Sequence, residues 1–142
     1  MPRKDIFHDS VKIGLEKDGW IVTDDPLLVT VDETTIFIDL GLEPVYYAEK
    51  GEQHIAVEVK SFKIQSSITA FYEAVGKFCV YKTTLELSRF ADLGFVLYLA
   101  VPKNIYDTFF KRRIVQETLK RYEVNHLVYN PLNDSIITWI KY

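Results

Sequence analysis

The stretch Ile55-Ala56-Val57-Glu58-Val59-Lys60 decides how this sequence is interpreted. Side chains alternate across a β-strand, so positions 55, 57 and 59 share an apolar face. Glu58 and Lys60 share the opposite face, about 7 Å apart along the backbone. We expect the apolar face to lie on the core, which leaves a carboxylate and an ammonium group side by side. This pattern predicts either an ordinary ion pair, worth about 0–1 kcal/mol, or a chemical site.

A second acid precedes this stretch. Asp39 ends the strand expected over 35–40, and 18 residues separate it from Glu58. A hairpin centred on Gly51 places Glu58 opposite position 44, next to Glu43, so that Asp39 lies about 13–17 Å farther along a regular strand. We therefore hypothesise a kink near Gly41 that returns Asp39 to Glu58, with Glu43 as a further acid.

Two carboxylates and a lysine in one place suit metal-assisted phosphodiester hydrolysis. Asp39, Glu58 and Glu43 offer the oxygen ligands that Mg²⁺ (or Mn²⁺) prefers, and the ion keeps waters that a phosphate displaces. The metal would polarise the phosphodiester and acidify a water, while Lys60 orients that water or neutralises developing charge. With Asp39, Glu58 and Lys60 as the catalytic set, the pattern resembles the PD-(D/E)xK nuclease core.

The helix expected after this strand adds polar candidates. Glu73, Lys77 and Tyr81 recur at four-residue steps and form one stripe. Many nucleases of the type that the pattern resembles carry Gln-x-x-x-Tyr at this point, and this sequence replaces the amide with a cation. Lys77 either meets a phosphate or pairs with Glu73 on the surface.

Two auxiliary features lie elsewhere in the chain. His8 lies on the first expected helix, where it either completes the site or packs at the edge of an apolar face. The run Lys111-Arg112-Arg113 is the only dense basic run. It either contacts DNA phosphates or forms a solvated helix face.

The sequence indicates one domain over residues 1–142, without repeats or linkers. Apolar periodicity predicts an α/β fold (α+β, with a mixed sheet and helices on its faces) in the order helix, strands, helix, strand, helix, hairpin. The expected helices cover 5–17, 68–87 and 104–121, and the expected strands cover 20–23, 27–31, 35–40, 45–49, 55–60, 95–101, 126–129 and 136–140.

Composition argues against several classes of protein. The 17 Lys+Arg against 20 Asp+Glu give a net charge of −3, which counts against a protein that coats nucleic acid non-specifically. The longest apolar run, 95–101, is far shorter than the ~20 residues that span a bilayer. The single cysteine, Cys79, forms no internal disulfide, which indicates the reducing cytoplasm.

Several motifs together resemble the cyanobacterial XisH family. They are Lys4-Asp5-Ile6-Phe7-His8-Asp9, Lys17-Asp18-Gly19-Trp20, Ile38-Asp39-Leu40-Gly41, Ala48-Glu49-Lys50, Ile55 to Phe62, Leu97 to Pro102 and Tyr106-Asp107. The resemblance implies a restriction-endonuclease-like fold. It also implies a controlling factor for excision of the fdxN element, a DNA segment removed during heterocyst differentiation, which acts with a site-specific recombinase and a companion called XisI.

Two functions are therefore open: an accessory factor that directs excision, or a metal-dependent DNA endonuclease that uses Asp39, Glu58 and Lys60. DNA is an expected partner in both. We also hypothesise a homodimer through the C-terminal hairpin that carries Trp139, because an unpaired strand edge recruits a second chain.

Overall fold

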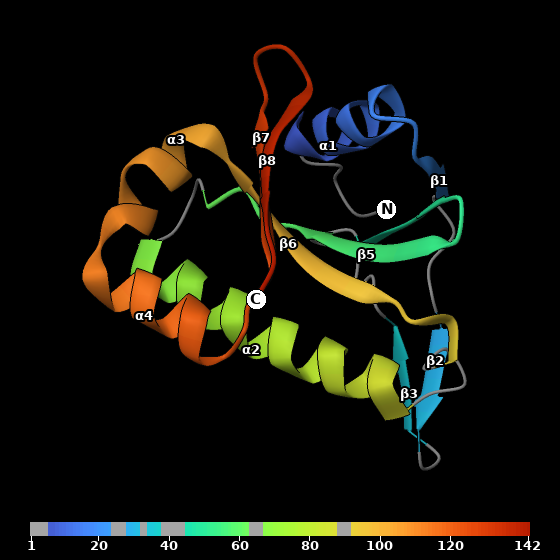
Figure 1. The fold of residues 1–142 in the computed structure, drawn as a ribbon. Helices are drawn as coiled ribbons and strands as arrows, with labels where there is room; N and C mark the ends of the chain where they lie inside the picture. Colours follow the sequence, from blue (N-terminus) through green and yellow to red (C-terminus); the bar gives the residue numbers. More distant parts are fainter. Residues whose placement is uncertain (1–5, 24–27, 32–33, 38–44, 63–66, 88–91) are drawn as a thin grey trace.

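The computed structural model describes residues 6–23, 28–31, 34–37, 45–62, 67–87 and 92–142 of the 142 (Figure 1). Its elements are α1 (Ile6–Lys17), β1 (Ile21–Thr23), β2 (Leu28–Val31), β3 (Thr34–Phe37), β4 (Val45–Lys50), β5 (Gln53–Val59), α2 (Ser67–Leu87), β6 (Val96–Pro102), α3 (Lys103–Asp107), the 3-10 turn η2 (Phe109–Lys111), α4 (Arg113–Arg121), β7 (His126–Asn130) and β8 (Ser135–Ile140).

Six strands form one mixed sheet in the order β1-β4-β5-β6-β7-β8. The three central strands β5, β6 and β7 are parallel, and the outer pairs are antiparallel. Strands β2 and β3 form a separate hairpin. The predicted fold class, a mixed sheet with helices, is confirmed.

The β4–β5 hairpin has a register one residue away from the expected one. Lys50 pairs with Gln53, so the turn consists of two residues, Gly51 and Glu52, and Glu58 faces Val45 rather than position 44. Gly51 has a φ of 60°, which a glycine adopts without steric cost and which tight hairpins require.

Helix α1 forms and ends as the sequence pattern predicts. Val11 and Leu15 are fully buried against one face of the sheet. The helix ends at Lys17, and the φ of 91° at Gly19 allows the Trp20 N–H to donate to the Leu15 carbonyl oxygen at 3.0 Å. This is the left-handed glycine cap that closes many helices.

Both faces of the sheet are covered, as the expected arrangement of a mixed sheet with helices on its faces requires. Val57 packs in a core with α1, whereas Ala56 packs in a second core with residues of α2 and α4. Figure 1 shows α1 apart from α2 and α4, which lie together across the sheet. Glu58 and Lys60, on the Ala56 face, are therefore buried.

The helix expected over 104–121 is broken into α3, η2 and α4. Thr108 interrupts it with φ −118° and ψ −82°. As a result, Ile114 is 64% exposed, whereas Phe110 is fully buried. The Gln116 side-chain amide donates to the Phe110 carbonyl oxygen and holds the corner.

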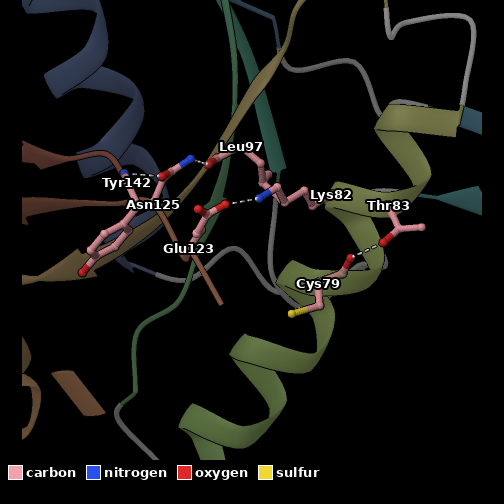
Figure 2. A network of polar contacts seen from close by, with 7 residues as sticks. All are labelled: Cys79, Lys82, Thr83, Leu97, Glu123, Asn125 and Tyr142. Atoms are coloured by element: carbon pink, nitrogen blue, oxygen red, sulfur yellow. Dashed lines mark hydrogen bonds and ion pairs between the residues drawn. The ribbon is translucent and has the colours of Figure 1, made fainter. Parts of the chain in front are cut away.

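Polar contacts join α2, β6 and Tyr142 to the residues that precede β7 (Figure 2). Lys82 Nζ lies 3.8 Å from Glu123 Oε2, which ties α2 to the α4–β7 turn. Asn125 donates to the Leu97 carbonyl oxygen at 3.3 Å and accepts from the Tyr142 N–H at 2.9 Å.

Among the helices described, none has the length and apolar character that a membrane crossing needs.

Candidate functional site

Glu58 and Lys60 lie at the C-terminal end of β5, in the middle of the sheet. Glu58 pairs with Val45 on one side and with Leu99 on the other. The Lys60 N–H donates to the Ala100 carbonyl oxygen at 3.2 Å, so the parallel ladder continues to this residue. Glu58 is only 1% exposed and Lys60 only 5%. A buried carboxylate and a buried ammonium therefore share one face of a central strand.

Helix α2 supplies a charge partner for Lys60. Lys60 Nζ lies 3.6 Å from Glu73 Oε2, and the Glu73 side chain remains 45% exposed. The sequence placed Glu73 in a polar stripe on this helix but did not predict that it reaches the β5 lysine. The sequence signal for this contact is the four-residue spacing, which places Glu73 on the same side of α2 as Lys77 and Tyr81.

The other members of the stripe differ in burial. Lys77 is half-buried. Tyr81 is 5% exposed and packs in the core that α2 shares with the sheet. An auxiliary role for either side chain stays a prediction.

The proposed metal ligands are only in part described. Asp39 and Glu43 lie outside the described residues, as does the kink hypothesised near Gly41. His8 lies in α1, but its side chain is also outside the description. Within the described ranges, no group of three His, Cys, Asp or Glu side chains is placed to hold a metal ion. Glu58 is thus the one predicted metal ligand whose surroundings are described.

The backbone adopts a left-handed conformation two residues after Lys60. Phe62 has a φ of 60°, an uncommon conformation for a bulky residue, and yet its side chain is buried. Its ring packs edge-on against Phe110, with centroids 5.7 Å apart. Such strain costs about 1–3 kcal/mol and persists only where the surrounding structure enforces it. Packing against the α3–α4 corner holds Phe62 in this conformation.

The basic run lies at that same corner. Lys111, Arg112 and Arg113 are exposed where η2 passes into α4. Lys111 Nζ lies 4.3 Å from the centroid of the Tyr106 ring, and the Arg112 guanidinium carbon lies 5.1 Å from that of Phe109. The two cations rest on rings of the protein while remaining exposed. The run is therefore available to an anionic partner.

The fold and this site define an α/β protein with a six-stranded mixed sheet and a buried acid–lysine pair on a central strand. The model of the XisH protein family matches residues 1–137. The chain belongs to the XisH family.

Two crystal structures agree with this assignment. An XisH family protein from Nostoc punctiforme PCC 73102 is 39% identical, with a TM-score of 0.85 over 96% of this chain and 100% of that one. An fdxN element excision controlling factor protein from Anabaena variabilis is 40% identical, with a TM-score of 0.85 over 97% of this chain and 100% of that one. No curated protein matches the chain.

Proposed function

We propose that this protein is a controlling factor for excision of an fdxN-type DNA element and acts as an accessory factor rather than as the enzyme that cuts. One observation carries the proposal. The chain is 40% identical, essentially from end to end, to the Anabaena variabilis protein described as such a factor. Its expected partners are DNA, a site-specific recombinase and XisI, in the cytoplasm of a cyanobacterial cell.

The exposed basic run supports a contact with DNA. Lys111, Arg112 and Arg113 present positive charge on a chain whose net charge is −3. Local rather than overall positive charge suits a protein that meets DNA at one place together with other proteins.

Excision in cells tests this function. In a strain that carries the element but lacks its own copy of this gene, amplification across the rejoined chromosomal junction measures excision. Restoring the intact chain should raise the junction signal to the level of the parent strain, and an empty vector should not. An unchanged signal with the protein present at normal abundance would contradict the proposal.

A second candidate function is metal-dependent DNA hydrolysis on a restriction-endonuclease-like fold. The specific support is the pair of buried charges, Glu58 and Lys60, on one face of β5 with Glu73 beside the lysine. An oxygen donor held in a buried position fits a hard cation such as Mg²⁺ or Mn²⁺. Glu58 would hold the ion with Asp39 and Glu43, and the ion would polarise a phosphodiester. Lys60 would donate to the attacked phosphate or to the attacking water.

A nicking assay separates the two functions. Supercoiled plasmid is incubated with Mg²⁺ or Mn²⁺ and with the intact protein, Glu58→Gln or Lys60→Met. Glu117→Gln is the control, because it removes an exposed acid on α4. Nicking by the intact protein and the control but by neither site variant would establish the hydrolase. Absence of nicking, together with a melting temperature that neither metal raises, would leave the accessory function.

A further inference from the structure

A wide groove lies on the α1 side of the sheet, beyond the end of that helix. Its volume is about 1110 Å³. Ile55, Val96 and Tyr98 form part of its floor, and these residues pack on the same face as α1. The remaining lining consists of Asp18, Trp20, Lys50, Gly51, Glu52, Gln53, His54, Leu93, Gly94, Trp139 and Lys141. The groove opens where the parallel strands begin, whereas Glu58 and Lys60 lie where β5 ends.

Aromatic rings from opposite edges of the sheet meet in this groove. Trp20 precedes β1 and Trp139 belongs to β8, yet their ring centroids are 6.0 Å apart and their planes are tilted by 35°. The strong twist of the sheet explains the contact, since β8 crosses the direction of β5 in Figure 1. Tyr98 meets the edge of Trp139 at 5.0 Å. The two indoles are half-buried, so part of each ring remains accessible.

Lysines flank these rings. Lys50 Nζ lies 5.9 Å from the centroid of the Trp20 ring and donates to the Asp18 carbonyl oxygen at 2.7 Å. Lys141 follows β8, at the other edge of the sheet. Asp18 and Glu52 also line the groove, so its formal charges balance. A balanced groove does not attract a long polyanion, but its two ammonium groups can each neutralise one phosphate.

We propose that this groove binds a short unpaired stretch of DNA. Bases stack on the accessible parts of indole rings whatever their sequence, and lysines beside the rings contact the flanking phosphates. The carboxylates accept hydrogen bonds from base N–H groups, including the N3–H of thymine. Bases in a duplex are already stacked and cannot reach the indoles. The inference rests on the proposed function, because strand breakage and rejoining during excision expose unpaired bases.

Tryptophan fluorescence reports on this groove alone. The chain has two Trp residues and both line the groove. Titration with an eight-nucleotide oligo(dT) should quench the emission, whereas the same length of duplex should not. Trp20→Leu should weaken oligo(dT) binding roughly 5- to 100-fold through the loss of one stacking surface. Lys50→Ala leaves the core intact and should also weaken binding.

Salt dependence tests the phosphate contacts. With two lysines on single-stranded phosphates, the log–log slope of affinity against salt should be about −1.4. Lys50→Ala combined with Lys141→Ala should bring it close to zero. Lys103→Ala is the matched control, since that lysine pairs with Asp107 at 2.6 Å outside the groove. The Lys103→Ala variant should bind oligo(dT) with the affinity and the salt slope of the intact protein.

Three results would overturn the proposal: no quenching by oligo(dT), equal quenching by duplex, or unchanged binding in folded Lys50→Ala and Trp20→Leu. The excision assay distinguishes this failure from that of the proposed function. Oligo(dT) binding without any effect on excision would count against the excision function alone. Normal excision without oligo(dT) binding would count against the groove alone.

Discussion

Lys60 Nζ lies 3.6 Å from Glu73 Oε2, and this ion pair joins the end of β5 to α2. The two partners differ in exposure: the Lys60 side chain is 6% exposed and that of Glu73 is 45% exposed. The lysine therefore depends on the protein for its charge balance, while the glutamate can be solvated without it. Removing the Glu73 carboxylate therefore tests the ion pair more directly than removing the lysine does.

Glu73→Gln should lower the free energy of unfolding by about 1–3 kcal/mol, because it leaves a buried ammonium group without this carboxylate. Lys60→Met keeps the apolar stem and should cost less. Chemical denaturation of both single variants and the double variant measures the coupling between them. Strictly additive losses would show that the pair contributes nothing to stability.

Acid should destabilise the fold through His126. Burial lowers the pKa of His126, partly opposed by its hydrogen bond to the Val124 carbonyl oxygen. The unfolded chain then binds its proton at a higher pH than the folded chain, so stability falls as pH drops below the ordinary value of about 6.5. One proton accounts for at most about 1.4 kcal/mol per pH unit.

Urea unfolding at pH 7 and pH 5 measures this loss. His126→Gln should show a smaller difference between the two pH values than the intact protein. Equal differences in the two proteins would assign the acid sensitivity to other groups.

Glycine substitutions should change stability in opposite directions. Gly76 lies inside α2, and a methyl group there meets nothing within 4 Å, so Gly76→Ala should stabilise the protein by about 0.5–1 kcal/mol. Gly51 is equally open but has a φ of 60°, so Gly51→Ala should cost about 1 kcal/mol. Gly14→Ala should gain less than Gly76→Ala, because its methyl group would lie 3.0 Å from Ile136 Cδ1 and 3.3 Å from the Asp134 carbonyl oxygen. Thermal melts compare the three; a lower melting temperature for Gly76→Ala would contradict this explanation.

The basic run should set the salt dependence of duplex binding. If Lys111 contacts a phosphate, Lys111→Ala should make the log–log slope shallower by about 0.9. Lys17→Ala removes the same charge from α1, across the sheet, and should leave the slope unchanged. Fluorescence anisotropy at several salt concentrations measures both slopes, and equal slopes for intact protein and Lys111→Ala would exclude this contact.

Local pattern predicted most of the fold. The period-two alternation around Glu58 predicted a strand that the structure contains, and the first helix ends at Lys17, as expected. The prediction of one continuous helix over 104–121 was wrong. Periodicity does not reveal the break at Thr108, which lets Phe109 and Phe110 both enter the core.

Of the candidate site, only the residues on the strand could be predicted from the sequence. Glu58 and Lys60 follow from the sequence, but an alternating polar face looks the same whether it meets water or a helix. Their burial depends on α2 packing over that face, which is a tertiary property. The pairing of Lys60 with Glu73 required the placement of α2 for the same reason.

The most direct test of the central claim is excision in a strain whose only copy of this protein carries Glu58→Gln. An accessory factor that does not hydrolyse DNA should still restore the rejoined junction to near the level obtained with the intact chain. Protein abundance is measured alongside, so that misfolding is recognised. Loss of the junction while folded Glu58→Gln protein accumulates normally would contradict the accessory function and favour catalysis by this chain.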